Sequence, residues 1–441
     1  MTLSPPRTNQ GLDLELVAEI REEVGSRLSD FQRSVSIDTD PALREQNEQA
    51  LAVEVIWDLL NTRARERELE GLRQIDGDVE EAVAKRVYDD LFGLGGFEEY
   101  FSDPTVENIF VNGADRVFVN RAGALGTVQV PPIAESDLAL VQLVNRWASR
   151  LGRTERRFDV ANPRLDLRLP GGYRLHAIME VTLRPTITIR CPFNRRLNFD
   201  DYINMGTVSP VLADFLGSAV RARTNIIIAG GTGTGKTTLL RTMLDQVPGD
   251  ERIITIEDTL ELALSKYHEE HPNVVEMETR QANVEGVGEL TMLDLTRECL
   301  RMSPDRVVLG EVRGGEALYM LKAMSQGNDG SMCSIHADSA YGVADRVRGY
   351  CAEANNGIPM PVIDGFFRNA VDLIIHVKIL PGPERRRVIS SILEVQKDSG
   401  ENVRYNELFS PMPHDVAAPS SPPSEKLRER LIIAGMQVSP W

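Results

Sequence analysis

One glycine-rich stretch, residues 230–237, limits what this chain can fold into. It is Gly-Gly-Thr-Gly-Thr-Gly-Lys-Thr, which fits the pattern G-x-x-x-x-G-K-[ST], and it lies between an apolar run at 225–229 and a helical pattern at 238–244. A strand, such a loop and a helix in this order form a phosphate-binding loop, because backbone N–H groups and the helix N-terminus surround a phosphate. A glycine-rich turn that binds nothing is the alternative, and the correct flanking patterns disfavour it.

This loop supplies the expected nucleotide site. Lys236 is expected to bridge the terminal phosphates, and the hydroxyl of Thr237 is expected to bind Mg²⁺. The chain lacks the Asn-Lys-x-Asp motif that reads guanine and the Leu-Ser-Gly-Gly-Gln signature of transporters, which disfavours a GTPase and an ABC transporter. The expected cofactors are ATP and Mg²⁺. The expected nucleotide-binding residues are Gly230, Gly231, Thr232, Gly233, Thr234, Gly235, Lys236, Thr237 and Thr238.

Two acidic segments follow apolar runs downstream of the loop. Glu257 and Asp258 end one run, and Glu311 ends another, in which Gly310 stands where a metal-binding Asp is usual. One acid at a strand end is more often a loop residue or a helix cap, but two in one α/β unit indicate groups that hold the metal shell and orient the attacking water. We expect Glu257 and Asp258 to support the metal. The sequence leaves both Glu257 and Glu311 open as the base, and we favour Glu311.

One of the six histidines, His336, also follows an apolar run, at 332–335. A histidine at such a place is usually a hydrogen-bonded structural residue. The competing hypothesis is that it senses the γ-phosphate of the nucleotide.

The remaining patterns divide the chain into four expected domains. Helical spacing of apolar residues in three stretches predicts an N-terminal helical bundle at 1–92. Short strand-like runs around one helical pattern predict a small α+β domain at 93–200. Apolar strands alternate with helices over 205–410, as in a mostly parallel sheet covered by helices, and 411–441 are expected to be a tail with one helix at 425–433.

Charge narrows the classes of function. The chain has 49 basic and 66 acidic residues, a formal charge of −17, so we do not expect it to coat nucleic acid or an anionic membrane by charge alone. Residues 150–196 nevertheless contain eleven arginines and only four acids. The composition leaves open whether this segment is an arginine-rich surface or a set of guanidinium groups aimed at phosphate.

The expected compartment is the cytoplasm. The chain start lacks the apolar core of a signal peptide, and no run approaches the ~18 apolar residues of a membrane span. The four cysteines, Cys191, Cys299, Cys333 and Cys351, are scattered without a C-x-x-C pair, which predicts reduced, mostly buried thiols.

The ordered series of motifs resembles the type II/type IV secretion ATPases, and most closely the CpaF/TadA branch that powers assembly of tight-adherence pili. The resemblance covers roughly residues 78 to 395. It rests on the phosphate-binding loop and on the segments 91–95, 111–117, 256–262, 278–286, 300–307, 310–317, 329–331 and 336–339. It implies a RecA-like P-loop domain preceded by a small α+β, PAS-like domain, with the strand at Gly310 and Glu311 as an atypical Walker B.

The resemblance also implies a function. The chain would be an ATPase, a hexameric motor that couples hydrolysis of Mg-ATP to a membrane platform protein for pilin polymerisation or substrate export. Its α+β domain would swing over the nucleotide and supply arginines to the phosphates, and Arg174 and Arg190 match those residues. The implied catalytic set is Glu311, Glu257, Arg174, Arg190 and His336, and the implied metal set is Thr237, Asp258 and Glu257.

The implied partners are further copies of the chain in a homo-hexamer and inner-membrane platform proteins. The protein would then lie at the inner face of the plasma membrane, held there through its partner, and direct binding of nucleic acid is not expected. Two other functions remain open: a conjugation-type ATPase that moves DNA or effector proteins, and a nucleotide-dependent assembly scaffold that scarcely hydrolyses.

Overall fold

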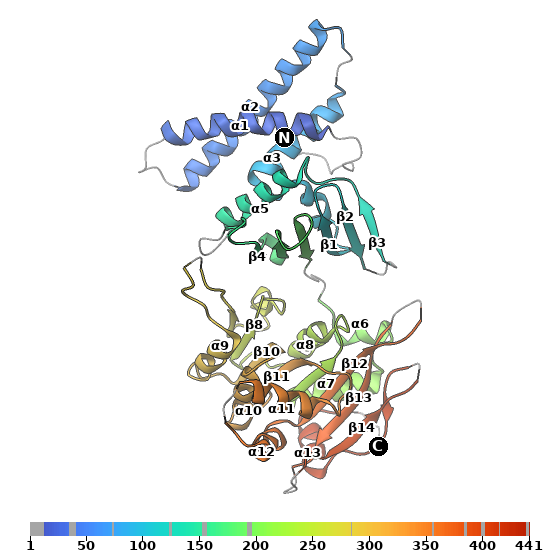
Figure 1. Cartoon of the computed structure of the whole chain (residues 1–441). Coiled ribbons are helices and arrows are strands. Elements are labelled where there is room, and N and C mark those ends of the chain that lie inside the picture. The colour runs from blue at the N-terminus through green and yellow to red at the C-terminus, as the bar shows by residue number, and fades with distance from the viewer. Residues whose placement is uncertain are drawn as a thin grey trace. The chain divides into compact units, whose positions relative to one another are not determined.

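The computed structural model describes residues 13–34, 41–72, 75–122, 126–151, 157–191, 196–283, 285–354, 357–382, 386–397, 402–413, 415–437 and 441. Residues 152–156 and 192–195 of the arginine-rich segment therefore lie outside the described residues. Contacts divide the chain into two compact units, residues 1–194 and 195–441, which run from blue to teal and from green to red in Figure 1.

The first unit begins with the helical bundle that the apolar spacing predicts. Its helices are α1 (Leu14–Ser34), α2 (Pro41–Leu69) and α3 (Gly77–Phe92). Apolar side chains one and two turns apart on each helix meet in a buried cluster that includes Val17, Ile20, Val24, Val55, Ile56, Val83 and Val87. The helices form because these apolar stripes bury one another, while the charged faces stay in water.

Arg86 and Asp90 of α3 join the bundle to the rest of this unit. The Arg86 Nε donates to Asp90 Oδ1 over 2.9 Å, and a terminal nitrogen donates to the Ile133 carbonyl. A Cβ at Gly95 would lie 2.7 Å from the Asp90 carboxylate, and one at Gly96 would lie 2.6 Å from the Arg86 guanidinium. Both positions are glycine because the buried ion pair fills that space.

An antiparallel sheet in the order β3-β2-β1-β6-β5-β4 follows the bundle. Leu140, Leu143 and Trp147 of α5 pack on the face of the sheet that carries Ile109 and Ile189. The elements are η1 (Gly95–Phe97), α4 (Glu98–Phe101), β1 (Val106–Asn112), β2 (Val117–Arg121), β3 (Thr127–Val130), α5 (Asp137–Leu151), β4 (Arg164–Arg168), η2 (Pro170–Gly172), β5 (Arg174–Ile178) and β6 (Thr186–Arg190).

The second unit is built on a nine-stranded sheet in the order β15-β14-β13-β12-β7-β11-β10-β8-β9. The strands from β12 to β9 pair in parallel, and β13, β14 and β15 add to β12 as antiparallel strands. The strands are β7 (Ile226–Gly230), β8 (Ile253–Glu257), β9 (Val274–Glu278), β10 (Arg306–Val312), β11 (Met332–His336), β12 (Leu373–Ile379), β13 (Arg387–Val395), β14 (Tyr405–Ser410) and β15 (Ala418–Pro419).

Helices cover both faces of this sheet, and two separate cores result. Side chains of α7, α8 and α13 pack with Ile226, Ile228 and Val308 on one face, and those of α9 to α12 pack with Ile227, Leu309 and Ile335 on the other. The helices are α6 (Phe199–Asn204), α7 (Pro210–Arg221), α8 (Lys236–Leu244), η3 (Leu264–Tyr267), α9 (Met292–Cys299), α10 (Glu316–Ser325), α11 (Val343–Glu353), α12 (Met360–Ala370) and α13 (Glu425–Ile433). The predicted fold class, a RecA-like α/β domain after an α+β part and helices, is confirmed.

The chain after residue 410 belongs to this second unit. The helix expected at 425–433 is α13, and its Leu427 and Leu431 are buried in the core cluster of α7 and α8. The rings of Trp441 and Phe215 form an edge-to-face contact, with ring centroids 5.9 Å apart. The segment is therefore a covering layer of the sheet.

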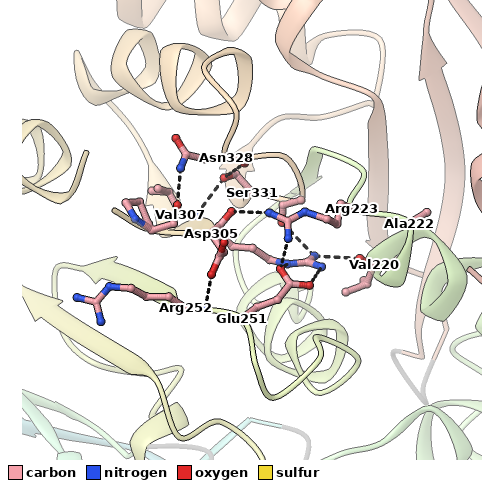
Figure 2. Close-up of polar contacts among 12 residues, drawn as sticks. Val220, Ala222, Arg223, Glu251, Arg252, Asp305, Val307, Asn328 and Ser331 are labelled. Atoms are coloured by element: carbon pink, nitrogen blue, oxygen red, sulfur yellow. Dashed lines mark hydrogen bonds and ion pairs between the residues drawn. The ribbon is translucent and has the colours of Figure 1, made fainter. Parts of the chain in front are cut away.

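A buried polar cluster occupies the edge of the sheet where β8, β10 and β11 begin (Figure 2). Arg306 is 0% exposed, and its Nε and one terminal nitrogen each donate to the Glu251 carboxylate over 2.8 Å. Its other terminal nitrogen donates to the Val220 carbonyl over 2.9 Å and to the Gly330 carbonyl over 3.3 Å. Arg306, the first residue of β10, therefore links the end of α7, the α8–β8 connection and the α10–β11 connection. These contacts lie at the end of the sheet opposite the phosphate-binding loop.

Three of the four cysteines, Cys299, Cys333 and Cys351, are buried and reduced, and Cys191 is half-buried and also free. Burial raises the pKa of the Cys333 thiol to about 12, so it stays protonated and unreactive at neutral pH.

Candidate active site

The phosphate-binding loop lies between β7 and α8, as its sequence context predicts. Gly233 and Gly235 have φ angles of 72° and 91°, which side chains with a Cβ rarely adopt. A Cβ at Gly230 would collide with the carbonyl oxygen of Val377 on the neighbouring strand. The glycines therefore let the backbone curl into a ring and pack against β12, which leaves the loop's N–H groups available to an anion.

Lys236, His336 and Glu311 form one continuous series of contacts. Lys236 is buried, and its Nζ donates to the Gly231 carbonyl over 3.0 Å and lies 3.3 Å from His336 Nδ1. The Nε2 of His336 lies 3.0 Å from Glu311 Oε1. A single imidazole tautomer, with its proton on Nε2, satisfies both contacts of the ring. The histidine is thus placed between the phosphate-loop lysine and the carboxylate that the sequence favours as base.

Strand pairing explains how Glu311 and His336 come to face each other. His336 lies beside Gly230 in the register of β11 and β7. The pairing of β10 with β11 shifts between Leu309 and Val312, and the Ser334 hydroxyl donates to the Gly310 carbonyl over 2.6 Å within this shift. Such an irregularity changes the direction in which a side chain points. The half-exposed Glu311 lies within this register shift.

Glu257 has a different environment from Glu311. Its side chain is 3% exposed, and its carboxylate accepts the backbone N–H groups of Glu261, over 3.1 Å, and Leu262, over 3.2 and 3.3 Å. A Cβ at Gly310 would lie 2.9 Å from Glu257 Cγ. Glu257 therefore fills the space that the usual Walker B aspartate would need, and this explains the glycine at 310.

Asp258 lies next to this carboxylate and pairs with the exposed Arg313. Its carboxylate also lies 3.3 Å from the Thr279 hydroxyl. Among the residues predicted for the metal, it is a partly exposed carboxylate with a cationic partner, whereas Glu257 is bound by backbone donors.

The packing of Gly310 against Glu257 gives a testable prediction. Gly310→Asp should lower the unfolding temperature by several degrees, because overpacking costs about 1–3 kcal/mol and a second carboxylate is added beside a buried one. Thermal unfolding of the full chain measures the effect. In a Glu257→Ala background, where the clash is absent, Gly310→Asp should lower the unfolding temperature much less than it does in the unaltered chain. An unfolding temperature of Gly310→Asp equal to that of the unaltered chain would contradict the packing argument.

Arg174 and Arg190 lie in the first unit and are direct cross-strand partners in the register of β5 and β6. Arg168 pairs with Arg174 in the register of β4 and β5. The sheet therefore carries three arginines side by side on the face opposite the buried Leu167, Leu175 and Ile189. A row of guanidinium groups suits an anion such as phosphate.

The prediction from the sequence did not include Arg168. A signal for it was present, because Arg168 and Arg174 flank the short turn around Pro170, Gly171 and Gly172 symmetrically. Residues placed symmetrically about a hairpin turn oppose each other on the paired strands.

Several residues of the second unit could hold a nucleotide with Mg²⁺. The curled loop, the helix N-terminus and buried Lys236 fit a phosphate chain, and the hydroxyl of Thr237 in the first turn of α8 fits a metal bound to those phosphates. Within the described residues no group of three or more His, Cys, Asp or Glu side chains could hold a metal ion without other ligands. The Thr237 hydroxyl suits Mg²⁺ that arrives with a nucleotide, because Mg²⁺ is usually bound through one or two protein ligands plus phosphates and waters.

Together, the parallel sheet, the phosphate-binding loop and the acids at the ends of neighbouring strands define a P-loop ATPase. The family model described as Type II/IV secretion system protein matches residues 94–401. The chain belongs to this family.

Individual relatives agree with the family. A Mycobacterium tuberculosis protein named for conjugal transfer is 34% identical over 351 residues, which are 78% of this chain and 96% of the relative. The type IV secretion system protein VirB11 of Brucella suis is 30% identical over 326 residues, which are 68% of this chain and 88% of the relative. The solved structure of the Legionella pneumophila ATPase DotB is similar with a TM-score of 0.50 at 18% identity, over 68% of this chain and 79% of that one, and supports the fold alone.

In the part of the chain that the structure describes, no helix combines the length and the hydropathy needed to span a bilayer.

Proposed function

We propose that this chain is the motor ATPase of a secretion or pilus-assembly machine, which works as a homo-hexamer and couples hydrolysis of Mg-ATP to a membrane platform protein. The observation that carries the proposal is the contact series from Lys236 through His336 to Glu311. It joins a phosphate-binding cation to a carboxylate at the end of the next but one strand. A scaffold that only binds nucleotide would need the cation but not the carboxylate.

The chemistry follows from these residues. The γ-phosphate of ATP would replace the Gly231 carbonyl and His336 as the partner of the Lys236 ammonium. Mg²⁺, when bound at Thr237 and the phosphates, neutralises part of the charge that develops on them. Glu311 would then accept a proton from the attacking water or orient it, since its carboxylate is half-exposed and aligned by His336.

His336 would report the state of the γ-phosphate. Its Nδ1 lies 3.3 Å from Lys236 Nζ, and it would gain a phosphate oxygen as a partner when ATP is bound. Glu257 is proposed to position the 258–262 loop and thereby Asp258, because its carboxylate is already bound by backbone N–H groups. This distribution of roles favours Glu311 over Glu257 as the base.

The row of Arg168, Arg174 and Arg190 is proposed to stabilise the charge on the transferred phosphoryl group, as the family resemblance implies for two of the three. The planar guanidinium suits phosphate oxygens. The register of β4, β5 and β6 supports this role, because it gathers the three residues at one end of the sheet.

Two machines are proposed as the setting. Assembly of a tight-adherence pilus is supported by the motif series of the CpaF/TadA branch, and it places the protein in the cytoplasm at the inner face of the plasma membrane. A conjugation-type secretion system is supported at least as well, since relatives at 30–34% identity are named for conjugal transfer and type IV secretion. DNA binding at graded salt separates them: a conjugation motor that handles DNA itself would bind with steep salt dependence, and a pilus motor would not bind DNA.

The first experiment on the proposal measures Mg-dependent ATP hydrolysis against protein concentration, with mass by light scattering. We expect turnover per subunit to rise as a six-subunit species appears, because a ring would complete each site. Loss of turnover on chelation of Mg²⁺, and its return when Mg²⁺ is restored, is the internal control. Tight nucleotide binding by a monomer without turnover at any concentration would instead favour the assembly scaffold.

A further inference from the structure

Arg387, the first residue of β13, lies against the outer rim of the phosphate-binding loop. Its Nε donates to the Gly233 carbonyl over 3.0 Å. Its Cδ lies 3.5 Å from the position that a Cβ at Gly235 would take. The side chain is nevertheless exposed to solvent. The guanidinium group is thus hydrogen-bonded to the loop through Nε, and the rest of the side chain is exposed to solvent.

The terminal nitrogens of Arg387 differ from its Nε in their contacts. Within the described residues the other N–H groups of Arg387 meet no hydrogen-bond acceptor and no carboxylate. The adjacent Arg386, by contrast, pairs with Asp415, Nη2 to Oδ1, over 3.3 Å. In a chain with 66 acids and 49 bases, a guanidinium that meets no carboxylate among the described residues, beside a phosphate-binding loop, points to an anionic ligand.

The order of strands determines which part of a nucleotide this arginine can face. In the order β13-β12-β7-β11-β10, Arg387 lies on one flank of β7, and His336 and Glu311 lie on the other. The transferred γ-phosphate belongs on the flank of His336 and Glu311. The flank of Arg387 is therefore left for the phosphates nearer to the nucleoside, which ATP and ADP share.

We infer that Arg387 binds these shared phosphates through its terminal nitrogens, so that it sets the affinity for nucleotide and the release of ADP without taking part in the chemical step. This rests on the proposed function, in which the loop holds ATP. A single side chain would contact the ligand through its terminal nitrogens and the loop through Nε at the same time. Lysine has one nitrogen and no fork, so it would make one of the two contacts well and the other poorly.

The test uses the full chain and fluorescently labelled ADP, with unlabelled ATP and ADP as competitors. Arg387→Ala should raise the Kd of both ADP and ATP about tenfold, which corresponds to about 1.4 kcal/mol, and should raise KM for ATP similarly. The kcat at saturating ATP should not fall, and ADP should dissociate faster in a chase experiment. Arg387→Lys should recover only part of the affinity, and the matched control Arg386→Ala should keep the Kd of both nucleotides within twofold.

Two results would overturn the inference. One is a Kd for ADP in Arg387→Ala equal to that of the unaltered chain. The other is a kcat that falls as much as the affinity does, because an arginine that only shapes the loop would disturb the chemistry as well. Lys236→Ala in the same assay distinguishes failure of this inference from failure of the proposed function. If Lys236→Ala leaves nucleotide binding unchanged, the loop is not the nucleotide site.

Discussion

Replacement of Glu311 by Gln should lower the rate of ATP hydrolysis roughly 10²- to 10⁴-fold, which is the usual contribution of a general base, and leave ATP binding within about threefold. The amide has the size of the carboxylate and can still accept a hydrogen bond from His336 Nε2, which lies 3.0 Å from Glu311 Oε1. It cannot accept a proton from water. Single-turnover hydrolysis and binding of a labelled ATP analogue measure the two effects separately.

Two variants serve as controls for this prediction. Lys236→Ala should lose nucleotide binding itself, because the buried ammonium is the cation of the loop. Glu257→Gln should lower stability as well as turnover, since its carboxylate accepts the N–H groups of Glu261 and Leu262. If Glu311→Gln hydrolyses ATP at more than a tenth of the normal rate while Glu257→Gln is stable and inactive, the base is Glu257.

The parts of the site that the sequence predicts well are those fixed by local chemistry. The loop at 230–237 needs glycines where φ is positive, at Gly233 and Gly235, and such positions are visible in a sequence. Glu311 and His336 come at the ends of apolar runs, and carboxyl ends of parallel strands lie at one edge of a sheet. The sequence therefore allows the prediction that Glu311 and His336 lie near each other, but it does not predict the hydrogen bond between them.

Features that depend on packing between distant segments were beyond the sequence. Nothing in Gly310 itself says that Glu257 occupies the space beside it, because the two residues meet only when β8 and β10 pair. The strands β13 and β14 were not predicted, because polar residues interrupt their apolar runs, as Ser390 and Ser391 do within Arg387–Val395. Arg387 was missed for this reason: without β13 there is no argument that brings it to the loop.

Arg306 is the strongest case of a residue whose sequence context misleads. It stands in one of the segments on which the resemblance to the secretion ATPases rests, yet it is 0% exposed and is the first residue of β10, at the end of the sheet opposite the loop. Gly330 beside it has a φ of 88°, and a Cβ there would lie 2.6 Å from an Arg306 terminal nitrogen. Asn328, from the same turn, donates to the Pro304 carbonyl. The motif at 300–307 and the turn at 328–331 are thus explained by one structural cluster.

Arg306→Ala should accordingly destabilise the second unit by about 3–5 kcal/mol, the usual cost of leaving one member of a buried ion pair without its partner. Among the described residues, the ionic partner left to Glu251 would be Arg223, whose Nη1 donates to Glu251 Oε2 over 2.9 Å from a partly exposed side chain. The reporter can be placed in this unit alone. Of the three tryptophans, Trp441 lies against Phe409 with ring centroids 5.4 Å apart, so a background with Trp57→Phe and Trp147→Phe makes the fluorescence specific to it.

Urea unfolding in that background then compares three variants. Arg223→Ala is the matched control and should cost at most about 1 kcal/mol, because a partly exposed pair contributes little and the bidentate contact of Arg306 with Glu251 stays. The double variant Arg306→Met with Glu251→Leu should recover at least half of the loss, since an apolar pair of similar volume avoids the unpaired charge. A midpoint for Arg306→Ala no lower than that of Arg223→Ala would mean that the cluster does not hold this edge of the sheet.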